Sequence, residues 1–102
     1  MNYRISRRAD ADIEAICQYI AKDNPDAADR LDQRMHEAIQ QLARVPGLGH
    51  RRADVQDGRY QFWNVGQYVI AYWVEQKELI VVRVIHGARD FRKLFKPKPP
   101  GG

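Results

Sequence analysis

The sequence predicts a single α+β domain, in which a helical hairpin packs on one face of a mainly antiparallel sheet in the order β-α-α-β-β-β. Two long segments in the first half carry apolar residues at helical spacing. Three segments in the second half carry β-branched and aromatic residues and are separated by short polar connections. A chain of 102 residues is long enough for one hydrophobic core, so residues 1–95 are expected to form one domain.

The composition excludes several classes of protein. Arg83 interrupts the longest apolar run, so no segment is long enough to span a membrane as a helix. The basic N-terminus is not followed by an apolar stretch, and no secretory signal is predicted. Cys17 is the single cysteine and cannot form an internal disulfide. These features together predict a cytoplasmic protein.

The net charge of +4 is unevenly distributed along the chain. Residues 1–45 contain 7 Lys and Arg against 8 Asp and Glu, whereas residues 46–102 contain 10 against 5. A basic second half favours an anionic partner, either a nucleic acid or an acidic protein segment. The alternative is a solvated basic surface without a partner.

The N-terminal segment is predicted to form a short strand followed by a helix. Residues 3–5 alternate in polarity, and Ser6 can then cap a helix over residues 7–22. Residues spaced by three or four positions place an apolar stripe on one face of that helix. The stripe consists of Ala9, Ile13, Ile16 and Ile20.

A second helix is predicted over residues 25–44, with Asn24 as its cap and Pro25 in its first turn. Its apolar stripe consists of Ala28, Leu31, Met35, Ala38, Ile39 and Leu42. The short link between the helices predicts an antiparallel hairpin. Residues 46–58 are rich in glycine and lack periodicity, so they are expected to form a loop whose His50-Arg51-Arg52 triplet is solvated.

Three strands are predicted over residues 59–65, 68–75 and 79–86. Because two-residue connections join them, they are expected to form an antiparallel meander. A short helical turn is expected to follow the last strand. Residues 96–102 contain only lysine, proline and glycine and are predicted to be an extended, flexible tail.

Strict alternation on the last strand predicts which face meets the helices. It places Leu79, Val81, Arg83 and Ile85 on one face and Ile80, Val82, Val84 and His86 on the other. The uncharged second face is expected to pack against the hairpin, which leaves Arg83 on an open face with Trp63 and Trp73 nearby. Such a face suggests a docking surface for another chain. The alternative is a tryptophan–arginine stack that only stabilises the fold.

Few residues have the chemistry needed for catalysis. The three histidines lie on separate elements and there is no cysteine pair, so no metal site or cofactor is predicted. Ser6 is the only serine and there is no threonine, which nearly excludes a hydroxyl nucleophile. The remaining candidates are Arg83, His86, Arg89, Arg92 and Lys93.

These candidates gather at the end of the predicted sheet, where two interpretations are open. A metal-free ribonuclease could use the imidazole of His86 as acid or base and the guanidinium groups of Arg83 or Arg89 to stabilise a phosphorane. Alternatively, His86 caps the end of the sheet and Arg89 pairs with Asp90 or Glu75.

Five local motifs follow one another between residues 3 and 95. They are Ser6-x-x-Ala9-x-x-Asp12-Ile13-x-x-Ile16-x-x-Tyr19-Ile20, Asn24-Pro25-x-Ala27-Ala28, Leu42-Ala43-x-x-Pro46-x-Leu48-Gly49, Tyr68-Val69-Ile70-x-Tyr72 and Val84-Ile85-His86-Gly87-x-Arg89-Asp90. Their joint order and spacing resemble the ParE toxins of the ParE/RelE superfamily.

That resemblance implies the toxin of a type II toxin–antitoxin system. It implies a ParD-like antitoxin as partner in a hetero-oligomer: a ribbon-helix-helix DNA-binding dimer with an acidic, initially disordered tail that wraps the toxin. The implied target is DNA gyrase, trapped on cleaved DNA, and this chain alone is not expected to bind DNA sequence-specifically. The RelE branch of the superfamily instead implies a ribosome-dependent endoribonuclease that cuts messenger RNA.

The sequence departs from the nuclease branch. An ungapped comparison places Tyr60, Phe62, Val69 and Phe95 where that branch uses basic residues and a C-terminal tyrosine or basic group, and only Arg89 is retained. Because an apolar side chain cannot move a proton or stabilise a phosphorane, a toxin without enzymatic activity is expected. The candidate target-binding residues are His86, Arg89, Arg92 and Lys93, and the candidate antitoxin-binding residues are Arg59, Trp63, Trp73 and Arg83.

Overall fold

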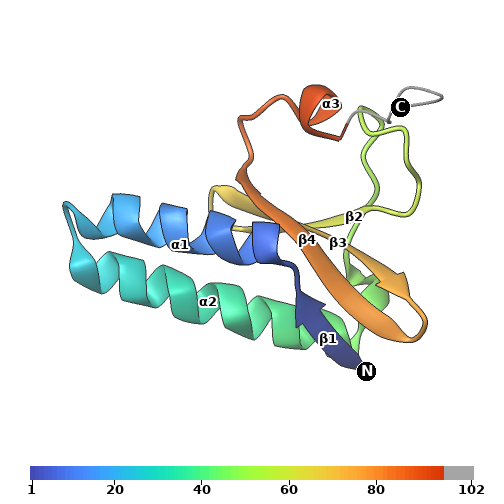
Figure 1. Cartoon of the computed structure of the whole chain (residues 1–102), viewed down its shortest axis with the longest axis horizontal. Helices are drawn as coiled ribbons and strands as arrows, with labels where there is room; N and C mark the ends of the chain where they lie inside the picture. The colour runs from blue at the N-terminus through green and yellow to red at the C-terminus, as the bar shows by residue number, and fades with distance from the viewer. Residues whose placement is uncertain (96–102) are drawn as a thin grey trace.

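A computed structural model describes residues 1–95 of the chain. Its elements are β1 (Asn2–Ile5), α1 (Arg7–Ala21), α2 (Pro25–Arg44), the short 3-10 helix η1 (Pro46–Leu48), β2 (Gln61–Val65), β3 (Tyr68–Glu75), β4 (Glu78–His86) and α3 (Phe91–Leu94). The predicted α+β fold is confirmed, since the α1–α2 hairpin lies along one side of the sheet and α3 lies on the other side (Figure 1). The expected flexible tail, residues 96–102, lies outside the described residues.

The four strands form one sheet in the order β1-β4-β3-β2. The predicted meander is confirmed, because β2 pairs antiparallel with β3 and β3 pairs antiparallel with β4. The N-terminal strand β1 then joins the outer side of β4 as a parallel neighbour. None of the helices within residues 1–95 has the length and apolar character needed to span a membrane.

Both long helices begin where the sequence predicts. The Ser6 hydroxyl accepts a hydrogen bond from the main-chain N–H of Ala9 at 3.1 Å, and the Asn24 side chain accepts one from Ala27 at 3.0 Å. Each cap satisfies one of the N–H groups that a helix leaves free in its first turn. Pro25 occupies the first position of α2, where its missing N–H costs nothing.

The main hydrophobic core lies between the helical hairpin and the sheet. It unites the stripes of α1 and α2 with residues from three strands. The buried members are Ala9, Ile13, Leu31, Met35, Ala38, Ile39, Leu42, Val65, Ile70, Tyr72, Leu79, Val81 and Val84. The predicted stripes of α1 and α2 therefore bury their apolar side chains in this core.

A second, smaller core covers the opposite face of the sheet. Its buried members are Val55, Phe62, Val69, Ala71, Ile85, Phe91 and Phe95. Val55 comes from the loop before β2, and the two phenylalanines at positions 91 and 95 come from α3 and the residue after it. The prediction that this face is open is therefore wrong, because the 49–60 loop and α3 close over it.

A β-bulge in β4 overturns the predicted assignment of residues to faces. Ala71 pairs with Arg83 but Tyr72 pairs with Val81, so Val82 is an extra residue on β4. An extra residue shifts the alternation by one position. Leu79 and Val81 consequently pack on the helices, and so does Val84 beyond the bulge. Of the four residues expected on the helix side, only Val84 belongs to the main core. Leu79 and Val81, which are predicted on the opposite face, also pack there.

The buried hydroxyl of Tyr72 anchors the loop after α2. It donates a hydrogen bond to the carbonyl of Pro46 at 2.7 Å and accepts one from the N–H of Gly49 at 2.9 Å. A Cβ atom on Gly49 would lie 2.8 Å from Cζ of that tyrosine ring, so this approach requires glycine. The anchored loop then leads to His50, which pairs with Phe62 on the outer edge of β2.

Candidate functional site

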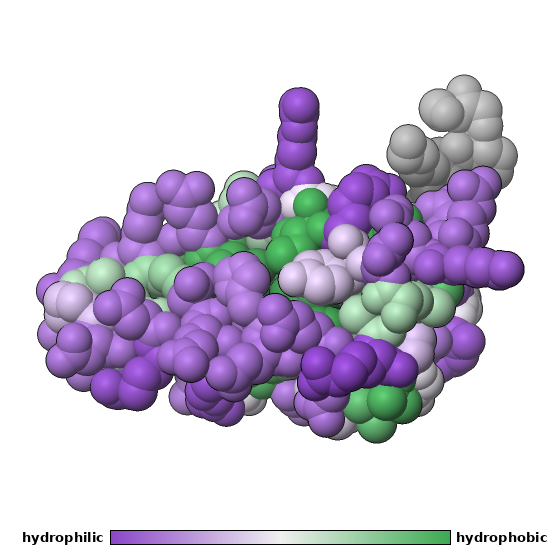
Figure 2. Space-filling model, turned by 90° about the horizontal axis from the view of Figure 1, so that it is seen from below, coloured by the Kyte–Doolittle hydropathy of each residue, from purple (hydrophilic) through white to green (hydrophobic). Residues whose placement is uncertain are grey.

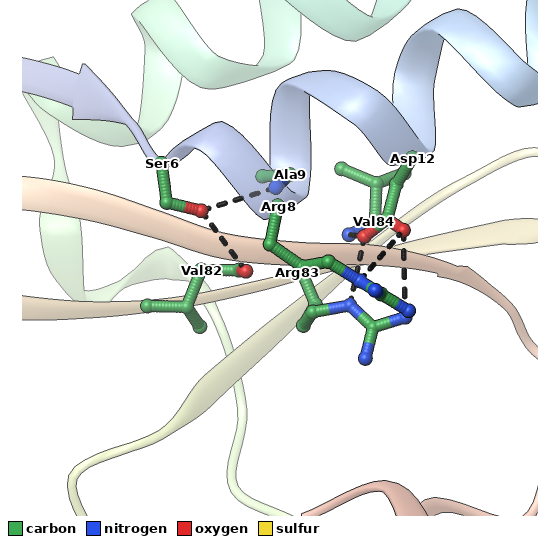
Figure 3. A network of polar contacts seen from close by, with 7 residues as sticks. All are labelled: Ser6, Arg8, Ala9, Asp12, Val82, Arg83 and Val84. Atoms are coloured by element: carbon green, nitrogen blue, oxygen red, sulfur yellow. Dashed lines mark hydrogen bonds and ion pairs between the residues drawn. The ribbon is translucent and has the colours of Figure 1, made fainter.

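Arg83 is held by a carboxylate of α1 instead of pointing to free solvent. Its Nε donates to Asp12 Oδ2 at 2.8 Å and its Nη2 donates to Asp12 Oδ1 at 3.4 Å (Figure 3). The arginine side chain keeps 18% of its accessible surface and the aspartate side chain keeps 12%. The expectation that Arg83 stands on an open docking face is therefore wrong, because α1 supplies a carboxylate partner that the residue pattern of β4 alone does not reveal.

The same end of α1 satisfies the main-chain groups that surround the bulge. Asp12 Oδ2 accepts the N–H of Val84 at 3.0 Å, and the Ser6 hydroxyl donates to the carbonyl of Val82 at 3.1 Å (Figure 3). Arg8 adds an outer ion pair to Asp12 at 3.6 Å. Ser6 and Asp12 therefore bind the first turns of α1 to β4 next to the β-bulge.

The two tryptophans lie on opposite faces of the sheet. Trp63 on β2 packs against the main core, whereas Trp73 on β3 lies beside Tyr60, a neighbour of the second core, with ring centroids 5.0 Å apart. They do not form the joint docking surface that the sequence suggests, because they sit at positions of opposite orientation in adjacent strands.

Arg59 stacks on Trp73. Its guanidinium carbon lies 4.4 Å from the centre of the indole ring, and Asp57 fixes the same group through a contact of 2.8 Å. The guanidinium of Arg59 lowers the pKa of the Asp57 carboxyl. This is the arrangement of the tryptophan–arginine alternative, formed by Arg59 in place of Arg83.

His86 ends β4 with both ring nitrogens occupied. Nδ1 accepts the main-chain N–H of Ala88 at 3.0 Å, and Nε2 lies 3.4 Å from Oε1 of Gln67. This geometry assigns the proton to Nε2, since Nδ1 acts as an acceptor. The ring of Tyr68 packs edge-on against the imidazole at 5.5 Å. Of the two interpretations, the geometry favours a histidine that caps the end of the sheet.

The other predicted target-binding residues form an exposed cationic surface. Arg89, Arg92 and Lys93 are exposed, and none of them forms an ion pair with any residue from 1 to 95. Asp90 instead accepts the N–H of Lys93 as the cap of α3. The pairing of Arg89 with Asp90 or Glu75 is therefore not formed, and this end of the molecule presents guanidinium and ammonium groups to solvent.

Arg52 has a role that sequence reasoning missed. It forms two 2.9 Å bonds with Asp54, and its guanidinium carbon lies 3.7 Å from the centre of the Phe91 ring. Arg52 lowers the pKa of the Asp54 carboxyl through these bonds. The residue thus ties the 49–60 loop to α3. An arginine two residues before an aspartate in a loop is the only signal in the sequence, and it does not identify Phe91.

Two further kinds of catalytic group can be assessed in the described residues, a metal site and a cysteine nucleophile. Within residues 1–95 there is no group of three or more His, Cys, Asp or Glu side chains placed to hold a metal ion. Burial, together with the charges of Asp32 and Asp29, raises the pKa of the Cys17 thiol. A raised pKa disfavours the thiolate, which is the nucleophilic form.

Comparison with known proteins identifies one matching family and a similar solved structure. The sequence matches the family model described as the ParE toxin of the type II toxin–antitoxin system, parDE, over residues 3–91. The fold is similar to a solved chain of the chromosomal ParDE toxin–antitoxin system from P. aeruginosa, with a TM-score of 0.73 and 21% identity, covering 84% of this chain and 95% of that one. A search of curated proteins finds no match.

Proposed function

Because this chain belongs to the ParE toxin family of type II toxin–antitoxin systems, we propose that it is a cytoplasmic toxin that inhibits DNA gyrase and is neutralised by a ParD-like antitoxin. The family match over residues 3–91 carries the proposal. The exposed cationic surface formed by Arg89, Arg92 and Lys93 supports it, since gyrase works on an anionic polymer and is itself bound to DNA while it turns over.

The proposed toxin acts by binding and not by chemistry. Phe62, Val69 and Phe95 occupy positions at which the nuclease branch needs polar groups, and all three are buried in the second core. Burial raises the pKa of Tyr60, which holds the remaining position, so its hydroxyl gives up its proton less readily than an exposed tyrosine would. The contacts of both ring nitrogens of His86 favour a capping role for this side chain over proton transfer.

The proposed partner is a ribbon-helix-helix antitoxin with an acidic tail, bound to the toxin in a hetero-oligomer. Arg59 and Trp73 form a candidate contact on one face of the sheet, and Trp63 forms a separate one on the other. Arg83 stays a predicted contact only through the small exposed part of its side chain. An antitoxin that touches all of these residues must pass around an edge of the sheet.

A supercoiling assay with purified components tests the target. Wild-type toxin at micromolar concentration is expected to reduce supercoiling by gyrase and to accumulate cleaved DNA. Replacing Arg89, Arg92 and Lys93 together by alanine is expected to weaken inhibition by about tenfold or more, because the lost contacts are electrostatic.

The matched control replaces three cations elsewhere, Arg7, Lys22 and Arg30, by alanine. These residues are exposed on α1, at its C-terminal end and on α2, and inhibition should stay within about twofold of wild type. Gyrase that keeps full activity with the wild-type toxin would contradict the proposed target.

A further inference from the structure

The loop before β2 and the segment after β4 carry an excess of positive charge on one side of the molecule. Figure 1 shows this loop and α3 on the same side of the sheet, away from the helical hairpin, and the second core joins them. Together, residues 49–60 and 86–95 contain six Lys and Arg against three Asp. Figure 2, seen from below the helices, shows that the hairpin is also mainly hydrophilic on its surface, but residues 7–44 contain six Lys and Arg against eight Asp and Glu. The sign of the charge therefore distinguishes the two sides.

Two of the three carboxylates on the positive side are already paired there. Asp54 forms two 2.9 Å bonds with Arg52, and Asp57 lies 2.8 Å from Arg59. The third carboxylate belongs to Asp90, which caps α3 through a main-chain N–H. The other arginine and lysine side chains of this side consequently form no ion pair with any residue that the structure describes.

Three of these cations, Arg89, Arg92 and Lys93, are exposed on a fixed piece of main chain. Phe91 and Phe95 keep 1% and 7% of their accessible surface and anchor the turn that contains the last two cations. A helical turn that buries positions i and i+4 directs the residues between them outward. Because the main chain is already held by the second core, less conformational freedom is lost when these side chains bind.

Exposed guanidinium and ammonium groups without carboxylate partners are suited to phosphate oxygens. Residues 89–93 extend over at most about 14 Å at ~3.5 Å per residue. Duplex DNA presents one negative charge per about 1.7 Å of its axis, so that length of duplex offers about eight phosphate charges. The helix α3 has four residues, which is too short for the recognition helix that reads bases in a major groove. The arrangement therefore favours contact with the phosphate backbone alone.

We propose that Arg89, Arg92 and Lys93 bind the phosphate backbone of duplex DNA directly and without reading its sequence. This inference deepens the proposed function and rests on it in one point, which is that the duplex met by the toxin is the one held by gyrase. The contact itself requires no gyrase and can be measured without it.

Fluorescence anisotropy of a labelled 20-base-pair duplex, titrated with the full-length toxin in the absence of gyrase, tests the proposal. We expect a Kd of about 10 μM or lower at about 50 mM KCl, and Kd values within about threefold of each other for two duplexes of unrelated sequence. Because three phosphate contacts release about three counterions, the logarithm of the affinity should fall against the logarithm of the salt concentration with a slope of about −2.7.

Replacing the three cations by alanine is expected to raise the Kd at least about tenfold and to bring the slope close to zero. Each single replacement should reduce the slope by about 1. The matched control, Arg7→Ala with Lys22→Ala and Arg30→Ala, removes the same charge from the hairpin and should keep the slope within about 0.5 of wild type. All of these side chains are exposed, so the circular dichroism spectra should stay that of wild type.

A second control removes the two lysines that follow the described residues, Lys96→Ala with Lys98→Ala. The Kd for the duplex should rise less than it does in the triple variant. If this control abolishes DNA binding while the triple variant retains it, the lysines at positions 96 and 98 form the binding site and the proposal is wrong.

The supercoiling assay separates failure of this inference from failure of the proposed function. A wild-type toxin that inhibits gyrase but does not bind the duplex would overturn the DNA contact and leave the proposed target intact. A toxin that binds the duplex as expected while gyrase keeps full activity would support the DNA contact and contradict the proposed target. Equal losses of affinity in the triple variant and its matched control would show that binding follows net charge alone, which would overturn the proposed site.

Discussion

The carboxylate of Asp12 joins the first helix to the last strand at the scale of single residues. It accepts from Arg83 at 2.8 Å and from the main-chain N–H of Val84 at 3.0 Å. A β-bulge leaves main-chain groups without ladder partners, and a buried group without a partner costs about 1–3 kcal/mol. The strand β1 pairs with β4 only as far as Val81, and beyond that point Asp12 of α1 supplies the acceptor for the N–H of Val84.

Replacing Asp12 by alanine is expected to lower the free energy of unfolding by about 2–4 kcal/mol, since it leaves Arg83 and Val84 unpaired in a largely buried place. The measurement is urea unfolding followed by circular dichroism. Arg8→Ala is the control: its side chain keeps 69% of its accessible surface, and the loss should stay below about 1 kcal/mol. Equal losses in the two variants would contradict this role for Asp12.

The Arg52–Asp54 pair predicts a dependence on pH. Because the folded state lowers the pKa of Asp54, this carboxyl adds stability above its unfolded pKa of about 3.9, and that stability is lost as the pH falls through the lower folded value. The urea midpoint of Asp54→Asn should therefore lie below that of wild type at pH 6. The two midpoints should converge toward pH 2.5, and a gap that persists there would exclude the ionised carboxyl as the cause.

At the scale of elements, periodicity predicted the helices correctly and alternation failed on β4. The stripes of α1 and α2 have a period that survives small errors in the helix ends. The faces of β4 depend on the parity of each residue, and one extra residue at Val82 reverses them. Nothing in the run Leu79–His86 marks that bulge, because its partner Asp12 lies 71 positions before Arg83.

The β3–β4 turn uses a demanding backbone conformation. Gln76 and Lys77 have φ values of 50° and 62°, which side-chain-bearing residues adopt at a cost. Lys77→Gly is expected to stabilise the protein by about 1 kcal/mol, as measured by thermal unfolding. Gly66→Ala supplies the reverse case, because Gly66 has a φ of 59° and alanine there should destabilise. Destabilisation by Lys77→Gly would contradict the turn geometry.

At the scale of the whole molecule, the second core explains why the C-terminal residues were the hardest to predict. The sequence predicts the helical turn and the cationic residues after β4, but it does not predict the contacts that attach them to the rest of the domain. Phe91 and Phe95 pack beneath the 49–60 loop, and Arg52 stacks on Phe91. Such contacts join segments about forty residues apart and leave no local pattern in the sequence. The family resemblance rests on the order and spacing of several motifs, and it predicted the family that the match over residues 3–91 shows, which no single motif identifies.

The position of the second core also bears on function. It buries Phe62, Val69 and Phe95, and it leaves Arg89, Arg92 and Lys93 outside on the surface. The second core thus supports an end of the molecule that presents cationic side chains to solvent.

The most direct test of this account follows gyrase and RNA in parallel, with wild-type toxin and with His86→Ala. We expect both proteins to arrest gyrase on cleaved DNA with potencies within about threefold of each other, because the proposed toxin acts by binding and uses no acid or base at position 86. Neither should create new RNA ends on ribosomes. New RNA ends that appear with wild type and vanish with His86→Ala, while gyrase turns over normally, would contradict it.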